Sequence, residues 1–238
     1  FREEMHSATV LRSKLDGWLA GRLMEKGIFV IPKYRVDELI VNNGSVEGVK
    51  ANEEELYANV VVAADGVLSF IGEKAGLRGR MDPKSYAVGI KEIIELPAER
   101  IEDRFNLDKG EGAAHLFIGD VTKGCFGGGF VYTNESTISL GVVVGIKALM
   151  DNPDSVKAHE LLDAFKDRYE LQRYIGGGKV AEYSAHLIPE AGFDGLPAVY
   201  GSGLLLAGDA AGLALNMGVT VRGMEFAIAS GVLAAETI

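Results

Sequence analysis

An aspartate stands directly after an apolar run near the end of the chain. The segment reads LLLAGDAAGLALNMG over residues 204–218, and Asp209 is its only charged residue. The three leucines predict a buried strand, so Asp209 is expected where that strand ends. Ligands of open α/β sheets bind beyond the carboxyl ends of the strands. A carboxylate there can accept hydrogen bonds from ligand hydroxyls, while the adjoining glycines and alanines let a bulky ligand approach.

A second aspartate has the same setting earlier in the chain. The segment VVVAADG, residues 60–66, ends in Asp65 and Gly66 after another apolar run. Both aspartates also have a simpler explanation, since Asp209 could cap the following turn or helix and Asp65 could mark a strand-to-turn transition. The next helix is predicted to begin near residues 218–220, where free N–H groups would favour an electron-rich or anionic ligand group.

Helices and strands alternate in the first third of the chain. Residues 6–27 carry apolar side chains close to one helical face and predict an amphipathic helix of about five turns, with Ser7 as N-cap. Strands are predicted in IFVIP (28–32) and in RVDELIV and SVEGVKA, which the turn NNG (42–44) joins as a hairpin. NVVVAAD (59–65) is apolar on both faces, which is typical of a parallel sheet covered on both sides.

The pattern changes from about Asp82. Four β-rich runs, beginning at residues 86, 113, 125 and 137, predict an antiparallel sheet, and residues 152–175 predict a helix. A buried strand then returns at GLLLAGD, followed by a long helix over 219–238. The expected fold is α/β, one domain interrupted by an antiparallel sheet with a helix. The predicted parts are residues 1–81, 82–187 and 188–238.

Composition excludes several functions. The formal charge of −10 without a basic run argues against nucleic-acid binding. The single cysteine, Cys125, rules out an intrachain disulfide and favours a reducing, cytoplasmic setting. The histidines lack metal-ligand spacing, so no metal site is predicted. No apolar run reaches the length of a membrane span, and a peripheral membrane contact stays open. The chain starts without methionine, and we expect it to be a piece of a longer protein.

Taken together, these segments resemble a known family. The helix VLRSKLDGWLA, the run GGGFVYTNESTISLGVVVG, the segment IGGGKVAEYSAHLIPEAG and the terminal GLLLAGDAAGLALNMGVTVRGMEFAIASG occur in order with compatible spacing. They are similar to the FixC-type electron transfer flavoprotein–quinone oxidoreductases, FAD-dependent enzymes of the glutathione-reductase-like superfamily. The resemblance implies a partial Rossmann-like FAD domain interrupted by a substrate or quinone domain, and no catalytic side chain, because FAD carries the redox step.

The resemblance also implies which residues contact FAD. Asp209 would meet its ribityl and phosphate part, and Arg12 would reach it from the first helix, although a solvated helix arginine is the alternative. The helix start at residues 218–220 would face the pyrimidine edge of the flavin, and the adenine would meet the backbone of Val36. The implied FAD-binding residues are Arg12, Val36, Ala64, Asp65, Gly66, Gly208, Asp209, Gly218, Val219 and Thr220.

The strongest motif of the superfamily is missing. G-x-G-x-x-G on a first strand and helix does not occur, and GCFGGG (124–129) opens into a strand instead. We therefore expect the βαβ unit that cradles the pyrophosphate to lie upstream of Phe1.

The implied partners are an electron transfer flavoprotein, a small ferredoxin-like protein and a quinone, at the inner face of a membrane. Two alternatives remain: a geranylgeranyl reductase-like flavoprotein that reduces isoprenoid double bonds, and a truncated, non-catalytic docking module. The sole tryptophan, Trp18, lies outside the segment GGGFVYTNESTISLGVVVG (127–145), where the reductases usually carry one. His186 could face flavin or quinone, or be an ordinary hydrogen-bonded histidine.

Overall fold

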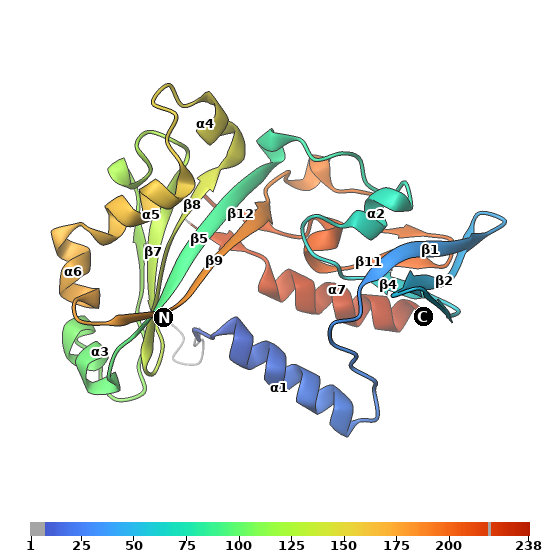
Figure 1. Cartoon of the computed structure of the whole chain (residues 1–238), viewed down its shortest axis with the longest axis horizontal. Coiled ribbons are helices and arrows are strands. Elements are labelled where there is room, and N and C mark those ends of the chain that lie inside the picture. The colour runs from blue at the N-terminus through green and yellow to red at the C-terminus, as the bar shows by residue number, and fades with distance from the viewer. Residues whose placement is uncertain (1–7, 219) are drawn as a thin grey trace, which may run out of the picture. The chain divides into compact units, whose positions relative to one another are not determined.

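A computed structural model describes residues 8–218 and 220–238 (Figure 1). The chain divides into two compact units. One contains the described part of Phe1–Pro32 together with Ile90–Val143 and Val156–Ala185, and the other contains Lys33–Gly89, Val144–Ser155 and His186–Ile238. The division into domains at residues 82 and 188 remains a prediction. The two units are described separately below.

A five-stranded sheet in the order β6-β7-β8-β5-β9 provides the framework of the first unit. β6 pairs antiparallel with β7, with Ala114 opposite Tyr132, as the sequence predicted for this pair. Helices line the sheet on one side (Figure 1). The strands are β5 (Tyr86–Glu95), β6 (Ala114–Phe117), β7 (Gly127–Thr133), β8 (Thr137–Gly145) and β9 (Lys179–Pro189), and the helices are α3 (Ala98–Phe105), α5 (Ala158–Lys166) and α6 (Tyr169–Ile175).

The core of this unit lies between the sheet and α5. Val131 and Phe165 are almost fully buried. Gly129 lets the Phe165 ring pack directly on β7, because a Cβ at that position would lie 2.7 Å from this ring. The helix predicted over residues 152–175 is divided in two, since Arg168 has an extended backbone (φ −63°, ψ 137°) that ends one helix before α6 begins.

The first helix is shorter than predicted. α1 spans Arg12–Glu25, 14 residues, and none of them is buried within the described structure. The predicted N-cap, Ser7, lies outside the described residues. No described strand forms over residues 28–32, so the strand predicted there is wrong. A strand needs a partner for its backbone N–H and C=O groups, and Phe29 is instead 92% exposed.

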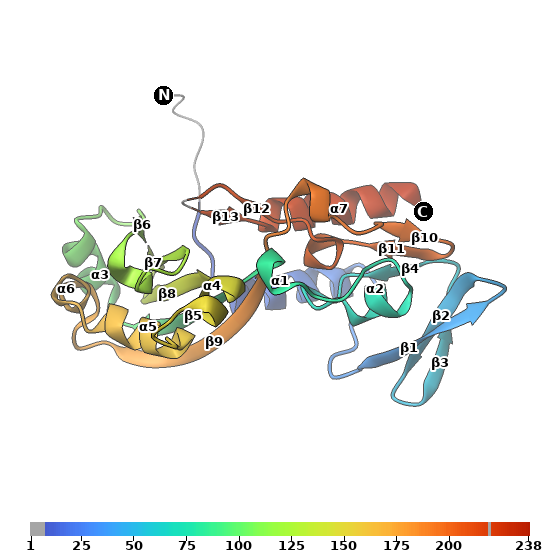
Figure 2. The ribbon, with the colours of Figure 1, turned by 90° about the horizontal axis from the view of Figure 1, so that it is seen from above.

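A three-stranded sheet of β1 (Val36–Asn42), β2 (Ser45–Ala51) and β3 (Glu54–Tyr57) begins the second unit (Figure 2). The predicted β1–β2 hairpin is confirmed, with Asn42 opposite Ser45. Its turn residues Asn43 and Gly44 both have positive φ, at 48° and 80°. Asn-Gly suits such a turn because both residues tolerate the left-handed region.

A second sheet joins segments that are far apart in sequence. β4 (Val61–Ala63) pairs in parallel with β11 (Leu204–Leu206), which also pairs antiparallel with β10 (Tyr200–Gly201). Leu204 and Leu206 are buried against α2 (Phe70–Lys74) and β2, in a cluster with Val46 and Ile71. The parallel pairing agrees with the sequence. The predicted coverage of this strand on both faces is not observed, because Val62 is 40% exposed in the described structure.

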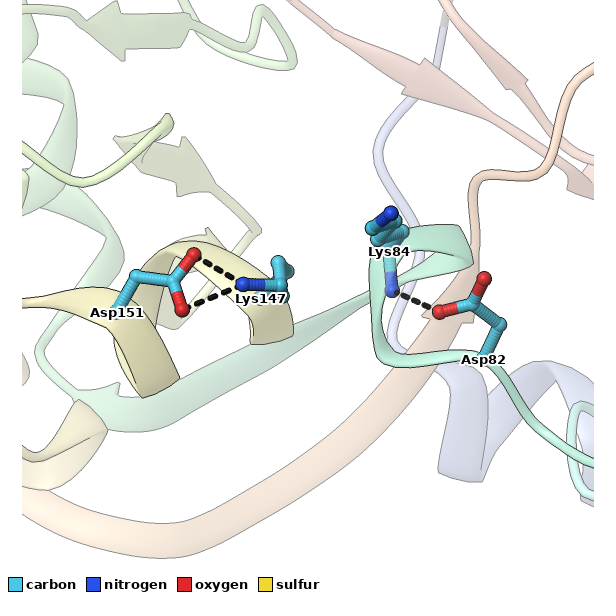
Figure 3. Close-up of polar contacts among 4 residues, drawn as sticks. All are labelled: Asp82, Lys84, Lys147 and Asp151. Atoms are coloured by element: carbon cyan, nitrogen blue, oxygen red, sulfur yellow. Dashed lines mark hydrogen bonds and ion pairs between the residues drawn. The ribbon is translucent and has the colours of Figure 1, made fainter.

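Short elements complete this unit. Asp82 accepts a hydrogen bond from the Lys84 N–H and caps η1 (Pro83–Ser85), and Lys147 pairs with Asp151 along α4 (Ile146–Asp151), as Figure 3 shows. The 3-10 turns η3 (Phe193–Gly195) and η4 (Gly208–Ala211) flank β10 and β11, and η2 (Asp120–Thr122) belongs to the first unit.

The last helix begins later than predicted. β12 (Leu215–Asn216) and β13 (Val221–Arg222) form a hairpin first, and α7 spans Met224–Thr237. Gly218 has φ of +86°, a left-handed conformation that cannot start a right-handed helix. Thus Gly218 and Thr220 belong to a hairpin turn, and the helix start predicted for residues 218–220 is wrong. Within the described residues, no helix is both long and apolar enough to cross a membrane.

Candidate functional site

The two aspartate-bearing segments follow the parallel pair β4 and β11 and leave the same edge of their sheet. Leu206 is opposite Ala63, and the Ala207 N–H donates to the Ala63 carbonyl at 3.0 Å. Both strands therefore end together, because the carboxyl ends of paired parallel strands meet at one edge. Ala64–Gly66 and Gly208–Asp209 follow directly. This edge has the geometry at which ligands of α/β sheets bind.

The carboxylate of Asp65 is engaged by the start of α2. Its Oδ2 accepts a hydrogen bond from the Ile71 backbone N–H at 3.0 Å, and its Oδ1 accepts one from Ser69 Oγ at 3.2 Å. The Ile71 N–H belongs to the first turn of α2, which has no partner for it within the helix. These contacts agree with the simpler explanation of Asp65, in which it serves the local transition from strand to turn.

Gly208 allows the loop after β11 to pack against α7. Its φ is +61°, and a Cβ there would lie 3.4 Å from Ala227 Cβ. The Gly208 N–H donates to Ser230 Oγ at 2.9 Å, and that hydroxyl in turn donates to the Ala227 carbonyl at 2.9 Å. Both contacts fix the position of the residue that precedes Asp209.

Asp209 lies beside the N-terminus of α7. It is half-buried in η4, and its Oδ1 is 3.8 Å from the place of a Cβ on Gly223, the N-cap residue of α7. Gly223 has no side chain that could cap this helix end, and the Glu225 carboxylate in the first turn accepts hydrogen bonds from its own backbone N–H and from Arg222. A carboxylate, small residues and the positive end of a helix dipole are thus gathered at one sheet edge. This helix end lies at Met224, six residues after Gly218.

The turn at residues 217–220 is closed by its own hydrogen bonds. The Met217 N–H donates to the Thr220 carbonyl at 2.9 Å, and the Gly218 N–H donates to Asn216 Oδ1 at 2.7 Å. The Gly218 N–H is therefore already used within the turn. Val219, predicted to contact FAD, lies outside the described residues.

Two of the predicted site residues lie elsewhere in the chain. Val36 is the first residue of β1 in the second unit and pairs with Ala51. Arg12 belongs to the first unit, where its guanidinium binds Asp16 at 3.0 Å. Both of those side chains are exposed, so the pair contributes little to stability. Arg12 therefore has the contacts of the solvated helix arginine that was the alternative.

Sequence reasoning missed Glu190. This residue follows β9, and its Oε1 accepts a hydrogen bond from Asn216 Nδ2 at 3.0 Å. Burial raises the pKa of the Glu190 carboxyl, while the hydrogen bond from Asn216 lowers it. The segment HLIPEAG drew attention only to His186, because a lone glutamate in a loop carries no sequence signal for a contact with a residue 26 positions away.

Arg78 was missed as well. Its Nη1 lies 3.5 Å from the Ala210 carbonyl of η4, and its guanidinium carbon lies 5.7 Å from the centre of the Tyr86 ring. Arg78 Nη2 also donates to the Tyr86 hydroxyl. The cation therefore links the loop after β11 to the start of β5.

Metal and nucleophile chemistry find no support in the described part of the chain. No group of three or more His, Cys, Asp or Glu side chains there could hold a metal ion. Cys125 is buried, as a small core side chain would be. The ring of His115 lies 5.4 Å from that of Phe105 and 5.5 Å from that of Tyr174, inside an aromatic cluster.

The fold is shared with a solved structure described as geranylgeranyl bacteriochlorophyll reductase-like, from Thermoplasma acidophilum. The TM-score is 0.74 at 23% identity, over 98% of this chain and 56% of that one. Residues 86–188 match the model of a family described as ETF-QO, ubiquinone-binding. This match relates the chain to one class of proteins, the electron transfer flavoprotein–quinone oxidoreductases.

Curated relatives narrow this class. The chain is 49% identical over 232 residues to Protein FixC of Escherichia coli O157:H7, covering 98% of this chain and 54% of that protein. It is 47% identical, with the same coverage, to the probable electron transfer flavoprotein-quinone oxidoreductase YdiS of Escherichia coli K12. The chain is a homologue of the FixC-type electron transfer flavoprotein–quinone oxidoreductases, and it spans about half the length of these relatives.

Proposed function

We propose that the full-length protein is an FAD-dependent oxidoreductase that passes electrons from an electron transfer flavoprotein toward a quinone. The observation that carries this proposal is the 49% sequence identity to Protein FixC over 98% of the chain. The match of residues 86–188 to a ubiquinone-binding family supports the quinone as acceptor.

The edge formed by β4, β11 and α7 fits one side of FAD. Gly208 and the alanines of η4 leave backbone rather than bulky side chains there, and Asp209 supplies a half-buried acceptor for ligand hydroxyls. The start of α7 adds the positive end of a helix dipole. Ala64, Asp65 and Gly66 would lie along the nucleotide half, with Val36 and Arg12 as further contacts. Bound FAD would supply the redox chemistry, and these residues would bind and orient it.

The turn between β12 and β13 would contact the flavin without the helix dipole expected from the sequence. Gly218 and Thr220 do not offer a helix dipole, and the Gly218 N–H is already bonded to Asn216. We propose that the turn containing Gly218 and Thr220 lies at the pyrimidine edge of the flavin, with Val219 as a further contact, and that α7 supplies the dipole from Met224 onward.

The partners follow from the same relatives. An electron transfer flavoprotein would be the electron donor and a quinone the electron acceptor, because YdiS is described as a probable electron transfer flavoprotein-quinone oxidoreductase. We further propose a small ferredoxin-like partner for the iron–sulfur cluster, and a cytoplasmic protein that meets the inner face of the membrane peripherally.

A geranylgeranyl reductase-like activity is the second candidate, since a described structural neighbour carries that name. That likeness concerns the fold, whereas the curated relatives at 47–49% identity favour electron transfer.

The visible absorption spectrum of the full-length protein tests the proposal. Flavin bands after purification are expected, and a folded but colourless protein that takes up no added FAD would contradict both candidates. Asp209→Ala should lower FAD occupancy while the urea unfolding midpoint of the apoprotein stays unchanged. Loss of fold and flavin together would instead assign Asp209 to capping. Glu182→Ala, an exposed change on β9, is the control.

A further inference from the structure

The hairpin β12–β13 is a small element that needs external support. It has only two opposed residue pairs, Leu215 with Arg222 and Asn216 with Val221. An isolated two-stranded hairpin is marginally stable in water. A turn that contacts a ligand must nevertheless keep one conformation, so some group outside the hairpin has to hold it.

Asn216 holds the turn from within. Its Oδ1 accepts a hydrogen bond from the Gly218 N–H at 2.7 Å, and its Nδ2 donates to Glu190 Oε1 at 3.0 Å. The two ends of an amide have almost the same shape but opposite hydrogen-bonding character. A carboxylate can only accept, so Glu190 selects the orientation in which the amide nitrogen faces it. The amide oxygen then faces Gly218.

Glu190 is itself fixed to the unit. Its backbone N–H donates to the Ser85 carbonyl at 2.7 Å, just before β5 begins. Its carboxyl is half-buried, and burial raises its pKa. A hydrogen bond to a partly desolvated carboxylate is stronger than one between neutral groups in water. The chain of contacts therefore runs from Ser85 through Glu190 and Asn216 to Gly218, entirely within the second unit.

We propose that Glu190 is a positioning residue, which sets the orientation of the Gly218 N–H in its turn through the side-chain amide of Asn216. The consequence for FAD rests on the proposed function, in which this turn faces the flavin. Glu190 would then act on FAD binding without touching the cofactor.

Four variants of the full-length protein test this inference. Each apoprotein is titrated with FAD, and binding is monitored by the quenching of flavin fluorescence. Glu190→Ala and Asn216→Ala should each weaken FAD binding on the order of tenfold. The double variant should be no weaker than either single one, because both remove the same link. Glu190→Gln should bind within about twofold of wild type, since its amide oxygen still accepts from Asn216. Glu182→Ala, on exposed β9, is the matched control.

Three results of the FAD titration would overturn the inference. They are wild-type affinity in Glu190→Ala, additive losses in the double variant, and a loss of affinity in Glu190→Gln as large as that in Glu190→Ala. Hydrogen exchange of the peptide containing Gly218 gives a readout that needs no flavin. Glu190→Ala should speed this exchange in the apoprotein, and an unchanged rate would refute the link even if wild type binds no FAD. If the wild-type protein binds no FAD but the exchange rates differ as expected, only the proposed function is refuted.

Discussion

Asp65 and Asp209 follow neighbouring strands, but their carboxylates have different surroundings. Asp65 accepts hydrogen bonds from Ile71 and Ser69 at the start of α2. Asp209 lies half-buried next to Gly223, at the start of α7. At the scale of single residues, the Asp65 carboxylate therefore has contacts that serve local structure, whereas a contact between Asp209 and FAD is our proposal.

Asp65→Ala should lower the free energy of unfolding by about 1–2 kcal/mol, because two donors at the start of α2 lose their acceptor. Asp65→Asn should lose less, since its amide oxygen can still accept one hydrogen bond. Urea unfolding of the apoprotein measures both changes. An unchanged midpoint in Asp65→Ala, together with weaker FAD binding, would show that the carboxylate serves the ligand instead.

At the scale of elements, close backbone contact governs the join between β2 and the β10–β11 turn. Gly203 has φ of +73°, and a Cβ there would lie 2.0 Å from the Val46 carbonyl oxygen of β2. The Val46 N–H also donates to the Ser202 carbonyl at 2.9 Å. These contacts hold the β1-β2-β3 sheet against the turn that leads into β11, the strand before Asp209.

Gly203→Ala should therefore destabilise the protein by more than about 3 kcal/mol, since strain at positive φ adds to a collision with backbone. Gly44→Ala is the matched control, because Gly44 has φ of +80° with open space around it and should cost only about 1 kcal/mol. Thermal unfolding of the two variants measures the difference. Equal midpoints would contradict the close packing of β2 on this turn.

The sequence predicted best the elements that are fixed locally. The β1–β2 hairpin was predicted from Asn43 and Gly44, whose types alone favour the turn. The β12–β13 hairpin was missed because it depends on Glu190, which is distant in sequence. The strand over residues 28–32 was predicted from apolar residues alone, but a strand also needs a partner. Glu190 and Arg78 could not be found, since only tertiary structure brings them to their partners.

At the scale of the whole molecule, the chain holds one side of the proposed FAD site. The described edge comprises the ends of β4 and β11 and the start of α7, and no G-x-G-x-x-G motif occurs in the sequence. A pyrophosphate cradle of that type would have to come from a segment outside these residues. FAD binding by the 238-residue chain alone should accordingly be much weaker than binding by the full-length protein.

Electron transfer from an electron transfer flavoprotein to a quinone, the proposed function, can be measured directly. The measurement is the anaerobic rate of reduction of a water-soluble ubiquinone analogue by a reduced electron transfer flavoprotein, with and without the full-length, FAD-loaded protein. Quinone reduction is expected to become fast and proportional to the concentration of the added protein. Quinone reduction that stays at the rate measured without the protein, although FAD is bound, would contradict the proposed function.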